Sequence, residues 1–118
     1  TFKVVTFAAE PASAGTPYVM YTVASSTTAV VLGLVLSNIN TTAVTAEVEL
    51  VSTTSSRGGA NNVANGTSFL IKDVSIPTGS SLEILSGGKV VLEAGDKIQI
   101  DCSVADKLSG TLSIMEIT

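Results

Sequence analysis

Residues 43–51, with the sequence AVTAEVELV, show the pattern that decides the fold. Apolar residues occupy every second position, and polar residues fill most of the positions between them. The apolar set is Val44, Ala46, Val48 and Leu50. Successive side chains of a β-strand point to opposite faces of the sheet, so this pattern predicts a strand with one buried and one wet face.

The same period of two recurs along most of the chain, while the helical period of 3.6 is rare. Thr, Ser, Val and Ile dominate, which also favours strands. The expected strands are residues 2–7, 17–24, 27–37, 43–52, 67–74, 80–85, 89–93, 96–104 and 110–117. Turn signals about every 8 to 12 residues are typical of a sandwich. We therefore predict an all-β protein with an antiparallel, jelly-roll-like β-sandwich.

The length of 118 residues fits a single domain. We expect that residues 17–118 form the sandwich domain. Residues 1–16 are expected to form an extended N-terminal arm or an edge strand, because the small residues and two prolines of residues 8–17 oppose regular structure.

Three turns are expected in the last third of the chain. Residues 86–88 (SGG) predict a hairpin between residues 80–85 and 89–93, since glycine tolerates the positive φ of tight turns. Residues 76–79 (IPTG) predict a β-turn with proline second and glycine fourth. With a third turn at residues 94–96, they predict that the last forty or so residues form a compact run of short antiparallel strands.

Residues 28–36, TAVVLGLVL, are apolar on both faces. Strict alternation places Val30, Leu32, Leu34 and Leu36 on one face and Ala29, Val31, Gly33 and Val35 on the other. Such a strand is either covered on both sides within the domain or meets a neighbouring subunit. Because both sheets of a small sandwich expose their outer faces, we favour a subunit contact.

The composition excludes several classes of function. A net charge of −4 without a basic cluster argues against nucleic acid as a partner. The chain has no His, which excludes Ser-His-Asp catalysis and His-bearing metal sites. No phosphate-binding loop occurs, so we expect no enzyme and no cofactor. The single Cys102 is expected in the core, on one strand face with Ile98, Ile100 and Val104.

Residues 92–101, LEAGDKIQID, form an acidic turn that could be a ligand site or a sheet corner. Calcium needs about six to eight oxygen ligands, and the two carboxylates around Gly95 fall short of that number. We therefore predict a structural turn in which Asp96 bonds the turn backbone, and no metal. Asp101 is expected on the polar strand face with Lys97 and Gln99.

The chain opens without a charged segment followed by an apolar one, so no secretion signal is expected. Its longest apolar stretch, residues 29–36, is eight residues and too short to cross a bilayer as a helix. We expect a soluble protein with no membrane partner.

Three blocks of sequence resemble a known family. They are YTVASSTTAVVLGLVLSNIN, LIKDVSIPTGSSLEILSGGKVVLEAGDKIQI and SGTLSIMEIT, within residues 17–118. They are similar to small virion structural proteins of tailed bacteriophages of the marine and cyanophage type, which are single-domain β-sandwiches described as structural, decoration or tail-associated. The resemblance brings no catalytic residues.

The resemblance implies a capsid decoration, or cement, protein on the outer head surface, made in the host cytoplasm. It would stabilise contacts between major capsid subunits, as a homo-oligomer for which a trimer is favoured. The alternative is a tail, neck or fibre protein with residues 52–68 as an outward loop. A third alternative, a carbohydrate-binding module, would use Tyr18 and Tyr21.

Eight residues are candidates for contacts with partners. Three lie in the expected arm or edge strand, two in the doubly apolar strand and three in the long polar loop. They are Phe2, Val4, Phe7, Val31, Val35, Arg57, Asn61 and Asn62.

Overall fold

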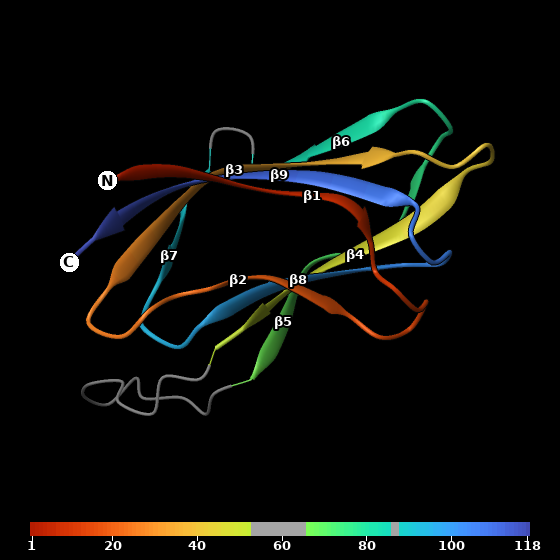
Figure 1. The fold of residues 1–118 in the computed structure, drawn as a ribbon. Helices are drawn as coiled ribbons and strands as arrows, with labels where there is room; N and C mark the ends of the chain where they lie inside the picture. The colour runs from red at the N-terminus through yellow and green to blue at the C-terminus, as the bar shows by residue number, and fades with distance from the viewer. Residues whose placement is uncertain (53–65, 86–87) are drawn as a thin grey trace.

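A computed structural model of the chain describes residues 1–52, 66–85 and 88–118. These residues form nine strands and no helix, and the strands make two antiparallel sheets that pack face to face (Figure 1). The predicted antiparallel β-sandwich is confirmed. Every expected strand has a counterpart whose ends differ by a few residues at most.

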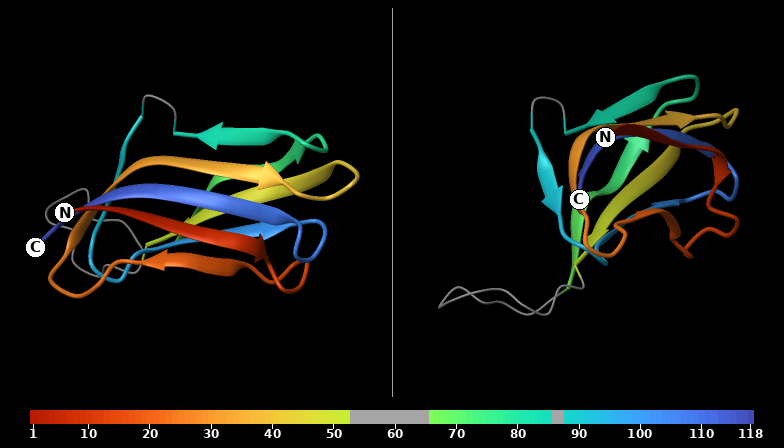
Figure 2. Two further views of the ribbon diagram at one scale, coloured as in Figure 1. Left: turned by 45° about the horizontal axis from the view of Figure 1, so that its top comes forward. Right: turned by 60° about the vertical axis from the view of Figure 1, so that its left-hand side comes forward.

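The first sheet, here called sheet A, contains five strands. Its main path runs through β1 (Phe2–Glu10), β9 (Leu108–Ile117), β3 (Thr28–Asn38) and β6 (Ser81–Ile84), which lie side by side in the left view of Figure 2. The fifth strand, β7 (Val90–Leu92), also pairs with β3. β1 therefore lies at the edge of this sheet instead of extending away from the domain.

The second sheet, sheet B, has the order β2 (Tyr18–Thr22), β8 (Lys97–Cys102), β4 (Val44–Val51) and β5 (Thr67–Ile76). The chain crosses repeatedly between the two sheets. The resulting strand orders are those of a jelly roll in which the strand between β5 and β8 is divided into β6 and β7.

The core fills the space between the inner faces of the sheets. Its fully buried side chains come from both sheets and include Leu34, Leu36, Val48, Ile98, Ile100, Leu112 and Ile114. Each large aliphatic side chain buried in this way stabilises the fold by about 1.5–3 kcal/mol. Cys102 is buried among them, as predicted, but Val104 is exposed because β8 ends at Cys102.

A bulge in β3 changes which of its residues face the core. The pairing of β3 with β9 shifts register between Val31 and Gly33, which inserts one extra residue. Val31 is buried before the bulge and Leu34 after it, although strict alternation places them on opposite faces. The expected face assignment is therefore wrong, and Val30 and Val35 share the outer face.

The hairpin expected between β6 and β7 does not form. β6 pairs with residues 34–37 of β3 and β7 with residues 29–31, both antiparallel, so β6 and β7 follow one another along one edge of β3. The long edge of β3 supplies backbone partners to one side of both strands, so the two strands lie in line instead of side by side. Nor do successive strands from β6 to β9 pair with each other, because β8 belongs to sheet B.

The turn after β5 forms one residue later than expected. The amide of Ser80 donates to the carbonyl of Pro77 at 3.1 Å, so proline is the first residue of the turn and Gly79 the third. Gly79 has a φ of +72°, the value that the third position of a type II turn requires. This explains why glycine occupies the position.

Candidate interaction surface

The outer face of sheet A carries a row of apolar side chains that crosses four strands. Strand pairing places Phe2 of β1 opposite Met115 of β9. It places Met115 opposite Val30 of β3, and Val30 opposite Val91 of β7. Directly paired residues project on the same face of a sheet, so these four side chains form one continuous row, here called the apolar row.

Solvent reaches much of this face. Phe2 is 75% exposed and Val91 is 62% exposed, while the two central members of the apolar row are half-buried. Val4 and Ile117 lie on the same face and are 63% and 51% exposed. At about 150–200 Å² for a fully exposed side chain, these four exposed residues contribute roughly 400 Å² of apolar surface. A patch of that size on one chain is often functional.

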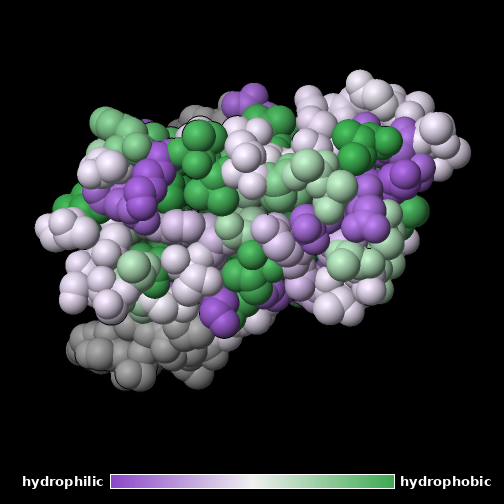
Figure 3. Space-filling view, in the orientation of Figure 1, coloured by the Kyte–Doolittle hydropathy of each residue, from purple (hydrophilic) through white to green (hydrophobic). Residues whose placement is uncertain are grey.

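Most of the rest of this face is polar and uncharged. The paired outward positions of β1, β9 and β3 that are not apolar are filled mostly by Ser and Thr: Thr6, Thr28, Ser37, Ser109, Thr111 and Ser113. The first charge along the face is Glu83 of β6, opposite Val35. Figure 3 shows hydrophobic, pale and hydrophilic side chains next to one another over the upper part of the molecule. A partner protein can cover the Ser and Thr part of this face without burying an unpaired charge.

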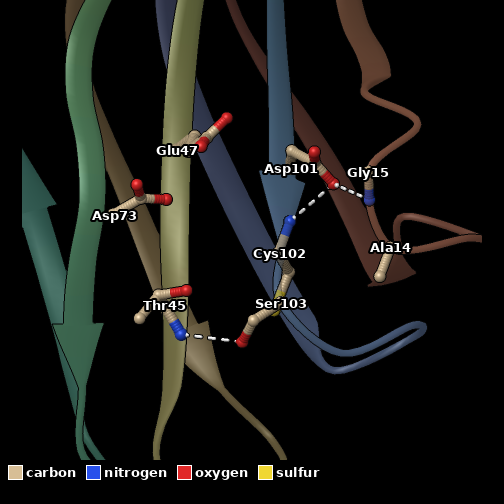
Figure 4. Close-up of a pocket in the computed structure, with 8 residues that line it drawn as sticks. All are labelled: Ala14, Gly15, Thr45, Glu47, Asp73, Asp101, Cys102 and Ser103. Carbon is tan, nitrogen blue, oxygen red and sulfur yellow. Dashed lines mark hydrogen bonds between the residues drawn. The ribbon is translucent and has the colours of Figure 1, made fainter.

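The outer face of sheet B is acidic and contains a pocket of about 160 Å³. Three carboxylates line it, from Glu47 of β4, Asp73 of β5 and Asp101 of β8 (Figure 4). Asp101 Oδ1 accepts hydrogen bonds from the amides of Cys102 at 2.8 Å and Gly15 at 3.2 Å, which ties residues 13–16 to β8. Burial and the hydrogen bond with Asp73 raise the pKa of Glu47. Within the described residues, no cluster of His, Cys, Asp and Glu could hold a metal ion.

The acidic turn within residues 92–101 has the predicted structural role. Asp96 Oδ2 accepts a hydrogen bond from the amide of Glu93 at 3.0 Å, and the Asp96 amide donates to the Glu93 carbonyl at 3.0 Å. Gly95 has a φ of +89°, and its amide donates to the carbonyl of Val23 at 3.0 Å. The bonding of the turn backbone by Asp96 is therefore confirmed.

Both tyrosines take part in contacts inside the sandwich. The hydroxyl of buried Tyr21 donates to Glu116 Oε2 at 2.6 Å, and Lys3 Nζ lies 2.7 Å from Glu116 Oε1. Lys3 and Tyr21 lower the pKa of Glu116, while burial and Glu116 raise the pKa of Tyr21. Tyr18 packs edge-on against Phe7, with ring centroids 5.4 Å apart. These contacts hold the two rings against the protein, where a sugar would need an exposed ring face.

The structure divides the eight candidate contact residues into three groups. Three of them, Phe2, Val4 and Val35, are exposed on the outer face of sheet A. Two, Phe7 and Val31, are buried in the core, since both point to the inner face. This burial removes them from the candidate surface. The remaining three, Arg57, Asn61 and Asn62, lie outside the described residues.

Sequence reasoning missed four residues on this face, namely Val30, Val91, Met115 and Ile117. In residues 89–92 (KVVL) alternation indicates that neighbouring valines face opposite ways, but not which of them faces solvent. The pairing of β7 with β3 decides that Val91 points outward.

Comparison with protein-family models finds no match, and no curated protein or solved structure matches the chain either. The part of the chain that the structure describes has no helix long and apolar enough to cross a membrane. By its fold the chain is a jelly-roll sandwich, and the outer face of sheet A is partly apolar and carries few charges.

Proposed function

We propose that this chain is a structural protein of a tailed-bacteriophage virion that acts as a capsid decoration protein. It binds the outer surface of the head and stabilises contacts between neighbouring major capsid subunits. The observation that supports this function best is the apolar row, which crosses four strands and ends in the exposed Phe2 and Val91. The resemblance of residues 17–118 to phage virion proteins is the reason for proposing a phage head as the particle.

The size of the surface suits a protein that is used in many copies. Covering roughly 400 Å² of apolar surface contributes about 10 kcal/mol at 25 cal/mol per Å². Association opposes this gain by about 4–15 kcal/mol, so one isolated contact is weak. A lattice of identical sites lets each copy touch more than one neighbour, which raises the overall affinity without new kinds of contact.

The charge distribution gives the protein an orientation on the particle. Docking through sheet A leaves the acidic pocket of sheet B, which Glu47, Asp73 and Asp101 line, on the side away from the head. The net charge of −4 on each copy favours repulsion between decorated particles in solution. The acidic face then forms the outside of the decorated head.

Binding to purified heads that lack the protein tests this function. Val91→Lys places a charge in the apolar row and should reduce binding at least tenfold. Val19→Lys is the matched control, because Val19 is 40% exposed on edge strand β2 of the other sheet. The control should bind as well as the natural protein.

Copies per particle, counted by quantitative mass spectrometry, distinguish the locations. A copy number near that of the major capsid protein supports decoration of the head. A few copies per particle would instead place the chain in the tail, neck or fibre. Equal binding by the Val91→Lys and Val19→Lys proteins would remove the apolar row from the docking surface.

A further inference from the structure

The edge of sheet A formed by β1 is regular over most of its length. β1 pairs with β9 without a register shift from Phe2 to Phe7, and the first irregularity lies between Phe7 and Glu10. Sheet edges present rows of unpaired amide and carbonyl groups, which template pairing with another strand.

The hydrogen bonds at the start of β1 identify which groups are free. Thr1 and Glu116 exchange two backbone bonds, of 2.8 Å and 2.7 Å. Bonded and non-bonded pairs alternate in an antiparallel ladder, so the backbone groups of Lys3 and Val5 also point toward β9. The groups of residues 2, 4 and 6 then point away from the sheet. Phe2, Val4 and Thr6 therefore offer both exposed side chains and open backbone groups.

The other sheet edges in the described parts of the chain are interrupted. The pairing of β2 with β8 shifts register between Val19 and Tyr21. The pairing of β5 with β4 shifts register on both sides of Val48 of β4. β5 also contains Asp73, whose φ is +51°. The edge formed by β6 and β7 is broken between the two strands. Bulges and breaks of this kind protect edges against pairing, and the first half of β1 lacks them.

We propose that a second copy of this chain pairs with β1 across a two-fold axis, antiparallel, with Val4 opposite Val4 of the second copy. This two-fold pair takes the place of the trimer that the resemblance favours. Phe2 then lies opposite Thr6 of the other copy, and the three open residues of each chain exchange six backbone hydrogen bonds in total. The two sheets A become one continuous sheet.

Charge and regularity select this register. It places Lys3 opposite Val5 of the second copy, and Lys3 is already paired with Glu116. A shift by one residue toward the N-terminus would set Lys3 directly opposite Lys3, and like charges at that position are unfavourable. A shift the other way would use Ala8, which lies in the irregular part of β1.

The inference deepens the proposed function, because the pair would join two apolar rows into one docking surface across the two copies. The paired segments are only about 17 Å long at about 3.4 Å per residue. Such a contact buries less than the roughly 1,200 Å² of a stable interface, so the pair should form in solution only at high concentration. On a particle, neighbouring sites supply that concentration.

Cysteine cross-linking of the purified protein tests the register. Cα atoms of a bonded antiparallel pair lie about 5.5 Å apart, within the range of a disulfide. Val4→Cys should therefore give a disulfide-linked dimer in mild oxidant. Thr6→Cys is the matched control on the same edge, because two residues 6 would lie roughly 13 Å apart along the pair. Cys102 is buried and common to both variants.

Sedimentation from micromolar to millimolar concentration tests the pair itself. The natural protein and Val4→Ala should approach about 24 kDa, twice the chain mass of 11.9 kDa. Val4→Lys should stay monomeric, because it sets two ammonium groups opposite one another. Equal cross-linking of Val4→Cys and Thr6→Cys, a monomer at every concentration, or a three-fold mass would each overturn the proposal. Neither measurement uses phage particles, so failure here is distinct from failure to bind heads.

Discussion

Gly110→Ala, which adds one methyl group to β9, should destabilise the fold by about 1–3 kcal/mol through overpacking. Gly110 lies on the inner face of sheet A, opposite Phe7 of β1. A Cβ at this position would lie 2.3 Å from Cε1 and 2.5 Å from Cζ of the Phe7 ring, where ordinary contacts are 3.4–4 Å. The ring is buried and packs against Tyr18, so it cannot turn aside without disturbing the core.

Gly33→Ala is the matched control, and it should raise the free energy of unfolding instead of lowering it. An added Cβ at Gly33 meets nothing within 4 Å, and the residue does not have a positive φ. Alanine loses less conformational entropy than glycine on folding into a strand, which stabilises by roughly 0.5–1 kcal/mol. The same chemical change at two positions of one sheet should therefore differ by about 1.5–4 kcal/mol in the free energy of unfolding.

Urea unfolding followed by circular dichroism measures both variants. With a slope of about 1–3 kcal/mol per molar urea, Gly110→Ala should lower the midpoint by about 1 M and Gly33→Ala should raise it slightly. Phe7→Ala removes the ring, so adding Gly110→Ala to that variant should cause no further loss. The reasoning is refuted if Gly110→Ala is as stable as Gly33→Ala, or if its penalty persists without the Phe7 ring.

Three further changes follow from single contacts. Asn38→Ala should lose about 2–3 kcal/mol, measured by urea unfolding, because buried Nδ2 donates to two backbone carbonyls at 2.9 and 3.0 Å; an unchanged midpoint would contradict this. Asp96→Ala should lose about 1–2 kcal/mol and Asp96→Asn clearly less, since the amide keeps an acceptor for the turn; equal losses would show that the acceptor is unimportant. Glu116→Gln should be less stable at pH 7, because Lys3 and Tyr21 lower the pKa of the carboxylate, and that stabilisation is present above its ordinary pKa of 4.5. It is lost as the pH falls through the lower folded pKa, so the two urea midpoints should converge as the pH falls below 4.5; a constant gap would contradict the direction of the pKa shift.

The strands of this fold could be predicted because their signal is local. Alternation at Val44, Ala46 and Val48 reflects one buried face, and the structure buries all three residues. The turn at Asp96 was also predictable, because an Asp beside glycine bonds the backbone within a few residues.

The partners of the strands could not be predicted, because hydrogen bonds between strands are long-range. Nothing within residues 80–93 indicates that β6 and β7 share the edge of β3 instead of pairing with each other. The bulge before Gly33 has the same origin, since it adjusts β3 to β9 some eighty residues further along the chain. For this reason Val31 lies in the core while Val35, which was expected on the same face, is exposed. The apolar row likewise became visible only with the register.

Radical footprinting of the protein, free and bound to heads, identifies the face through which it docks. Docking through sheet A should protect Phe2, Met115 and Val91 from oxidation, while Phe69 of sheet B, which is 44% exposed, should be labelled equally in both states. Protection of Phe69 with unchanged labelling of the apolar row would contradict the claim that the protein docks through sheet A.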